Sequence, residues 1–318
     1  MNYEKKYIKY KTKYLTLKAS SQNKNMTGGY KKKKLKTKFY FNKMIGGYKP
    51  YIESLEDIFT KFAGDTIEKS IQRDSELLAQ VLKEKEVSPC HGIEHAKTVM
   101  YHAWCALEDY ELSYEDQHAV LLAALLHDAD DNKFFPEHKN YENLRQILKQ
   151  TGKSSSFIED VVFMVSIVSA SKNGDRIPRC VRDKHWMLIP RYADRIEAIG
   201  IIGIERCYTY TKNVSKLPLY LESSPKPTTE EEIWALATEE RYNSYNGKSL
   251  SMIDHYYDKL LRLSVFPIKN KYFDIECAKR RQPLIDFLLY FGQKGSITFD
   301  EVEEFISEHS APRSKFHD

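Results

Sequence analysis

Residues 119–128 read AVLLAALLHD, an apolar run from Ala119 to Leu126 that ends in His127 and Asp128. A helix that is apolar on every side is a buried helix. The charged pair at its end must be hydrogen-bonded, paired or bound to a metal, because burying it bare costs free energy. The stretch therefore predicts a helical core with a polar, chemically competent position at one end.

Two more residues extend this pair into a candidate metal site. His95 lies upstream in HGIEHAKTV, and Asp194 lies downstream in PRYADRIEAIG. Two imidazoles and two carboxylates suit a divalent ion of the Mn, Fe, Co, Ni or Zn type. Asp194 has an alternative role as a helix-interior acid paired with a neighbouring arginine. We predict one metal site whose ligands are His95, His127, Asp128 and Asp194.

Helical periodicity extends through most of the chain from Tyr51 onward, and strand-like alternation is scarce. Apolar residues repeat at helical spacing at 55–62 and 77–82. Further helices are predicted at 93–110, 114–127, 139–150, 158–170, 187–210, 229–242, 250–264, 272–292 and 299–308. The pattern predicts an all-α fold of about nine or ten helices.

The charge is divided unevenly along the chain. Residues 1–50 contain fifteen lysines and a single acid, Glu4, which gives a net charge of +14, whereas the remainder carries −10 within a total of +4. We therefore divide the chain into a basic arm at 1–50, a helical domain at 51–310 and a tail at 311–318. The block of like charges in this arm indicates a disordered, solvated tail. The alternative is that residues 1–48 contact nucleic acid or another anionic surface through lysine and tyrosine.

Neither secretion nor a membrane span is indicated. The N-terminus has no apolar core of signal-peptide length, and no stretch of roughly 18 apolar residues occurs. The five cysteines are scattered and form no CxxC pair, so they predict reduced thiols in a cytosol-like compartment.

Several motifs together resemble the HD superfamily of metal-dependent phosphohydrolases. HGIEHAKTV is similar to its H-x-x-x-H-x-x-R-V opening, and AALLHDADDNKFF to its A-A-L-L-H-D-x-x-D-x-K segment. SIVSASKNG, YADRIEAIGIIGIER and IDHYYDKLLRL resemble later segments of a branch of small bacterial and fungal nucleotide (pyro)phosphohydrolases. The resemblance spans about residues 75–293. The opening YIKYKTKYLTLK also resembles the lead segments of giant-DNA-virus proteins, which would place the protein in the host cytoplasm or the virion.

The resemblance implies an HD-domain helical fold and the same ligands, His95, His127, Asp128 and Asp194. Two positions depart from the family pattern. Thr98 stands where arginine is usual, and Ile93 stands where tryptophan is common. Neither change removes a ligand, although the missing arginine alters how substrate or a ligand is held.

Other residues gain candidate roles from the same motifs. His91 matches the first histidine of the opening and is expected to support a ligand or contact phosphate. Asp131 is a candidate base for the attacking water, and Lys133 a candidate phosphate contact. Both have the alternative of a solvated loop. Further phosphate contacts, each with an ordinary surface role as its alternative, are Arg195, Lys259 and Lys172.

The expected activity is metal-dependent hydrolysis of nucleotides by a (d)NTP pyrophosphohydrolase or phosphohydrolase. Manganese is the favoured ion, with Mg, Co, Ni, Fe and Zn as alternatives. Two other functions stay open: a 5′-nucleotidase-type phosphomonoesterase, and a non-catalytic module that binds nucleic acid or a virion component through its arm. A homodimer is compatible with the sequence, which does not determine the oligomeric state.

Overall fold

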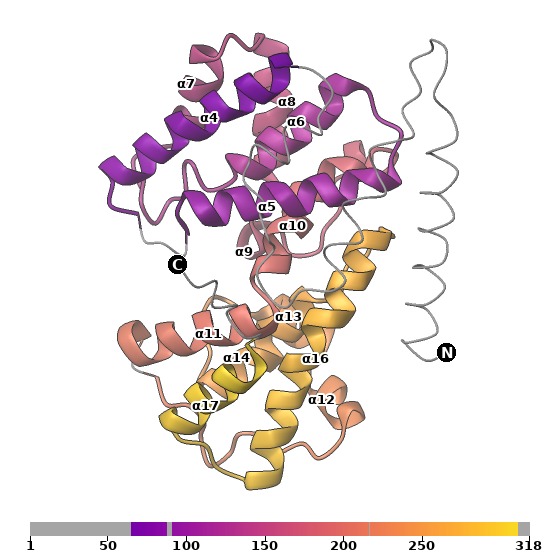
Figure 1. Ribbon diagram of the computed structural model, residues 1–318. Coiled ribbons are helices and arrows are strands. Elements are labelled where there is room, and N and C mark those ends of the chain that lie inside the picture. The colour runs from indigo at the N-terminus through magenta and orange to yellow at the C-terminus, as the bar shows by residue number, and fades with distance from the viewer. Residues whose placement is uncertain (1–64, 88–90, 216, 311–318) are drawn as a thin grey trace, which may run out of the picture. The chain divides into compact units, whose positions relative to one another are not determined.

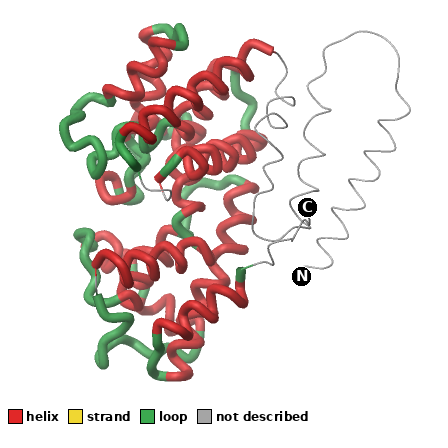
Figure 2. Tube along the Cα trace, turned by 60° about the vertical axis from the view of Figure 1, so that its left-hand side comes forward, coloured by secondary structure: helices red, strands yellow, loops and turns green. Residues whose placement is uncertain are grey.

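Every regular element in the described part of the chain is a helix, so the predicted all-α class is confirmed (Figures 1 and 2). The computed structural model describes residues 65–87, 91–215 and 217–310. These residues fall within one unit, Asp65–Ser310. The basic arm, the boundary near residue 50, the helix predicted at 55–62 and the tail at 311–318 lie outside the described residues.

Helix α6 (Tyr114–Leu125) is the centre of a first group of helices. Its residues from His118 to Leu125 are all buried, as the apolar run predicts. Ser113 caps its N-terminus by accepting a hydrogen bond from the backbone N–H of Asp116 at 3.1 Å. The helices packed on α6 are α4 (Asp65–Glu84), α5 (Ile93–Ala106), α8 (Ser155–Ser166) and α10 (Ile189–Glu197), and α7 (Glu142–Gln150) packs on α4 and α8.

Residues 187–210 form two helices, although the sequence predicts one. Helix α10 ends at Glu197, and α11 (Gly200–Tyr210) begins at Gly200, whose φ of +78° lies in the left-handed region that favours glycine. Gly203 then approaches the end of α10 closely, since a Cβ built on it would lie 2.4 Å from the carbonyl oxygen of Ala198. Both helices bury apolar faces, so the apolar pattern continues across the turn and hides it.

A second group of helices is built on α11 and α16 (Lys271–Lys294). Helix α17 (Phe299–His309) packs on α11, and α12 (Glu230–Leu236) packs on α16. The segment predicted at 229–242 divides at Ala237 into α12 and α13 (Glu239–Ser244). The segment predicted at 250–264 is continuous and consists of α14 (Met252–His255), the π-helical turn η6 (Tyr256–Leu260) and α15 (Leu261–Leu263).

Buried charges join the two groups at the C-terminal end of α10. The carboxylate of Glu197 lies 2.8 Å from a ring nitrogen of His102 and accepts a hydrogen bond from Arg280, also at 2.8 Å. Arg280 donates in addition to the carbonyl of Ile196 at 2.6 Å. These contacts connect α5, α10 and α16 and fix the turn of α10 that follows Asp194. None of the described helices is long and apolar enough to cross a membrane.

Candidate metal centre

His127 and Asp128 occupy the turn directly after α6. The side chain of His127 is 1% exposed, and its Nδ1 lies 2.9 Å from the carbonyl oxygen of Ala124. This contact requires a proton on Nδ1, so the neutral ring carries its lone pair on Nε2. Within the described residues, Nε2 is buried and has no hydrogen-bond partner. A buried nitrogen that is held in this orientation is suited to bind an acceptor of its lone pair, such as a metal ion.

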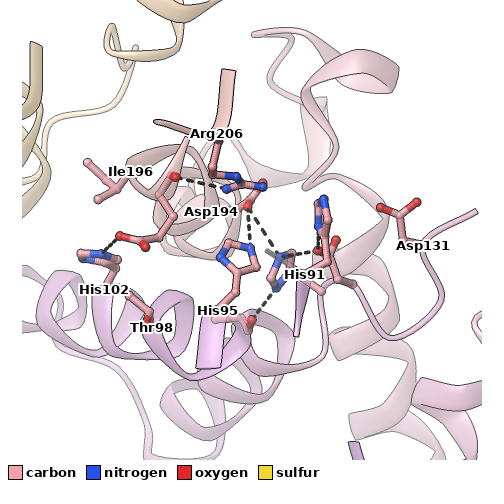
Figure 3. Close-up of polar contacts among 12 residues, drawn as sticks. His91, His95, Thr98, His102, Asp131, Asp194, Ile196 and Arg206 are labelled. Atoms are coloured by element: carbon pink, nitrogen blue, oxygen red, sulfur yellow. Dashed lines mark hydrogen bonds and ion pairs between the residues drawn. The ribbon is translucent and has the colours of Figure 1, made fainter. Parts of the chain in front are cut away.

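Helices α5 and α10 bring His95 and Asp194 to this nitrogen (Figure 3). Oδ1 of Asp194 lies 3.6 Å from Nε2 of His127 and 3.5 Å from Nε2 of His95. Oδ2 of Asp128 lies 3.4 Å from the same nitrogen of His127. The structure thus brings together all four residues predicted as ligands: His95, His127, Asp128 and Asp194.

The spacing of these atoms fits a shared divalent ion. Two ligand atoms bound at about 2.1 Å, at roughly 90–110° from each other, are separated by about 3.0–3.4 Å. The contacts of 3.4–3.6 Å lie slightly beyond that range. A small inward movement of the side chains would complete coordination. The donor set itself, two imidazoles and two carboxylates, suits several transition metals and does not select one.

Electrostatics also favour a cation at this position. Burial lowers the pKa of His127, but Asp128 and Asp194 outweigh burial and raise that pKa to about 9. Burial raises the pKa of both acids, but nearby histidines hold both pKa values below the ordinary range. The carboxylates are therefore ionised and attract positive charge to this position. A proton or a divalent ion can supply that charge.

His91 contacts the carboxylate of Asp128. Its Nδ1 lies 2.8 Å from Oδ2 of Asp128, and its ring lies 5.6 Å from that of Phe134. A histidine that hydrogen-bonds a ligand carboxylate orients that ligand and adjusts its basicity. Of the two roles predicted for His91, this arrangement agrees with the support of a ligand.

Asp131 and Lys133 lie on the loop after Asp128. Oδ1 of Asp131 accepts the backbone N–H of Lys133 at 2.9 Å, and Oδ2 lies 3.7 Å from the Lys133 ammonium. The Lys133 side chain is 68% exposed. In the view of Figure 3, Asp131 lies on the far side of His91 from Asp194. The exposed Lys133 side chain is thus accessible to a ligand in solvent.

Comparison with known proteins identifies a relative and a fold. No protein-family model matches the chain. The uncharacterized protein L803 of Acanthamoeba polyphaga mimivirus is 41% identical over 218 residues, which cover 63% of this chain and 88% of L803. The chain belongs to the L803 family. The viral relative agrees with the resemblance noted at the N-terminus.

Solved structures show the fold of this member of the L803 family. An HD-superfamily hydrolase of Bacillus thuringiensis is 18% identical, with a TM-score of 0.51 over 73% of this chain and 100% of that one. Bacillus subtilis YpgQ, solved in complex with ADP, is 18% identical, with a TM-score of 0.51 over 74% and 99%. A Lactobacillus plantarum protein is 21% identical, with a TM-score of 0.52 over 72% and 97%. The helices adopt the HD-domain fold.

Two of the predicted phosphate contacts, Arg195 and Lys172, lie elsewhere or face solvent. Arg195 is 1% exposed and donates to Oδ1 of Asp175 at 2.5 Å and to the carbonyl of Gly174 at 2.6 Å. Its guanidinium therefore holds the loop after α9 (Ala170–Asn173), contrary to the prediction for this L803-family protein. Lys172 lies on α9 itself with an exposed side chain.

Lys259 lies within electrostatic range of the predicted ligand Asp194. It belongs to η6, and burial lowers the pKa of its ammonium. The negative charge of Asp194 acts in the opposite direction, whereas the positive charges of Lys133 and Arg206 lower the pKa further. The Lys259 ammonium also lies 5.9 Å from the centre of the Tyr245 ring. Lys259 is thus within electrostatic reach of a predicted ligand, as a phosphate contact must be.

Arg206 is a candidate that the sequence reasoning missed. It lies on α11, and its Nη1 donates to the carbonyl of Glu197 at 3.2 Å, at the end of α10. Figure 3 shows it reaching over this end of α10, toward the side on which Asp194 lies. Arg206 is the last residue of the stretch YADRIEAIGIIGIER. Its position in this motif could have marked it as a candidate site residue.

His138 has structural contacts outside the predicted metal site. His138 lies 2.6 Å from Asp130, whose carboxylate also accepts the backbone N–H groups of Asn143 and Leu144 at the start of α7. Asp130, His138 and Glu142 are spaced closely enough to hold an ion. However, the Asp130 oxygens are already engaged in capping α7, so this group is better explained as a helix cap.

Proposed function

We propose that the protein is a divalent-metal-dependent phosphohydrolase that acts on nucleotides, as a (d)NTP pyrophosphohydrolase or phosphohydrolase. The observation that carries the proposal is the buried Nε2 of His127, which lies 3.6 Å from Asp194 and 3.4 Å from Asp128 and has no hydrogen-bond partner among the described residues. The HD-domain fold supports it, since one neighbour of that fold is an HD-superfamily hydrolase and another was solved with ADP.

The ligands would be His95, His127, Asp128 and Asp194. A divalent ion bound there lowers the pKa of water and polarises a phosphoryl oxygen. Around it, His91 holds the Asp128 carboxylate in position through its 2.8 Å contact. Asp131 would accept the proton of the attacking water. Lys259 and Lys133 offset the negative charge that develops on the phosphoryl group.

The proposal also concerns which phosphate bond is cleaved and which metal ion is bound. Attack at the α-phosphate of a nucleoside triphosphate would release pyrophosphate, whereas attack at a terminal phosphate would release orthophosphate. Manganese is the ion that we favour, and it is one of several ions that a mixed imidazole and carboxylate set accepts. Chromatography of the products distinguishes the two bonds, and it would also reveal a phosphomonoesterase.

The test is a panel of nucleoside mono-, di- and triphosphates, each assayed with Mn²⁺, Mg²⁺, Co²⁺ and Ni²⁺. We expect turnover of triphosphates with at least one ion. The variants His127→Ala and Asp194→Ala should lose it. The matched control is His138→Ala, which removes a histidine from the other group of acids near α7. Full turnover in either ligand variant, or none in the wild-type protein with any ion, contradicts the proposal.

A further inference from the structure

The guanidinium of Arg206 has no carboxylate partner among the described residues, unlike most arginines that lie near an acid. Its guanidinium donates to a neutral carbonyl, that of Glu197, at 3.2 Å, and it forms no ion pair with a carboxylate among the described residues. Six other arginines do form such pairs in this part of the chain, namely Arg73, Arg145, Arg195, Arg241, Arg262 and Arg280. Arg206 therefore keeps N–H donors and a full charge available for a ligand.

The location of Arg206 is set by the turn at Gly200. The turn reverses the chain, so that α11 returns past the end of α10 and Arg206 reaches the Glu197 carbonyl. Glu197 follows Asp194 by three residues, about one helical turn. The Glu197 carboxylate is itself fixed by Arg280 at 2.8 Å. The guanidinium is thus positioned one turn from a predicted metal ligand by a buried, rigid network.

Lys259 lies within electrostatic range of two other cations on this side of the site. Lys259 experiences the charges of Arg206, Lys133 and Asp194. Lys259 forms no ion pair with a described carboxylate, and Lys133 has only the 3.7 Å contact with Asp131. Like charges in one place repel one another, and a bound anion relieves that repulsion. The arrangement is therefore suited to a ligand with several negative charges spread over its length.

We infer that Arg206 contacts the phosphate chain of the substrate and, with Lys259 and Lys133, selects polyphosphates over monophosphates. The inference rests on the proposed function for its reaction, and it adds a residue and a substrate class to it. A guanidinium bonds two phosphate oxygens at once, which suits a chain of linked phosphates. A monophosphate held at the predicted metal site would leave some of these three cations without a negatively charged partner.

The first measurement is calorimetric binding of inorganic triphosphate and of orthophosphate to the Mn²⁺-loaded protein. We expect triphosphate to bind the wild-type protein more tightly than orthophosphate does. Arg206→Gln should weaken triphosphate binding by about 10- to 100-fold, because a charge-assisted hydrogen bond is lost. Arg206→Lys keeps the charge but not the paired donors, so its affinity for triphosphate should lie between those of the wild type and Arg206→Gln.

The matched control is Lys212→Gln, which removes one positive charge from an exposed site paired with Glu303. Circular dichroism confirms that each variant is folded. An affinity of Arg206→Gln within twofold of the wild type, or a wild-type protein that binds triphosphate no better than orthophosphate, overturns the inference. Triphosphate binding that depends on Arg206 without hydrolysis of any nucleotide would instead overturn the proposed function alone.

Discussion

Nε2 of His127 and Oδ1 of Asp194 lie 3.6 Å apart, although they come from the end of α6 and from the middle of α10. The packing of α10 on α6 makes this approach possible. The other ring nitrogen of His127 is held by the Ala124 carbonyl at 2.9 Å. The geometry therefore points Nε2 at a carboxylate, so positive charge must lie between them, either as a proton on Nε2 or as a divalent ion.

His91→Ala should weaken metal binding without abolishing it. The substitution removes the 2.8 Å contact that orients Asp128, but it leaves all four predicted ligands in place. Loss of such a supporting contact costs about 10- to 100-fold in metal affinity. Competition with a fluorescent chelator measures this affinity, and an unchanged value would show that His91 does not support the ligand.

Asp131→Asn should slow turnover and leave the metal content unchanged. The amide keeps the shape of the side chain but cannot accept a proton from water. A positioned general base contributes at least about 10²-fold to the rate, so kcat should fall by roughly that factor. Steady-state kinetics at saturating metal measure the change. If kcat stays within a factor of about two, another group acts as the base.

Buried His118 should make the protein less stable in acid. Burial, and then the charge of Lys153, lower its pKa from 6.5 to about 3. Between these values the unfolded state binds more protons, so the free energy of unfolding falls as pH falls, by about 1.4 kcal/mol per pH unit. His118→Gln removes this contribution. Urea unfolding across a pH series should give a shallower slope for the variant, and equal slopes would contradict the assignment.

Gly292→Ala should destabilise the second group of helices. A Cβ at this position of α16 would lie 1.8 Å from the carbonyl oxygen of Pro227, so the loop that carries Pro227 must move. Overpacking of this kind costs about 1–3 kcal/mol. Thermal unfolding measures the loss. The exposed neighbour Gln293→Ala serves as the control and should change little; a similar loss in both variants would rule out the steric explanation.

The four residues that the structure brings together could be picked out from sequence because each is marked by its immediate neighbours. His127 and Asp128 follow an apolar run, and His95 and Asp194 lie in motifs with a specific order. Arg195 misled the prediction because adjacency along a helix is not adjacency in space. Successive helical residues point in different directions, so Arg195 faces Asp175 while Asp194 faces the histidines.

Arg206 was missed for a related reason. An unbroken helix over 187–210 would carry it well away from Asp194, at about 1.5 Å per residue. The turn at Gly200 brings it back to the Glu197 carbonyl. A single glycine with positive φ therefore decides whether this arginine belongs to the site, and the apolar periodicity carries no trace of that turn.

The most direct test of the central claim is the metal content of the purified protein. Wild-type, His127→Ala and Asp194→Ala proteins would be incubated with Mn²⁺, dialysed against metal-free buffer and analysed by elemental mass spectrometry. We predict about one ion per wild-type chain, and a loss of nearly all bound metal in both variants with their helical circular dichroism retained. Wild-type metal content in either variant would show that the cluster of His95, His127, Asp128 and Asp194 does not hold the ion.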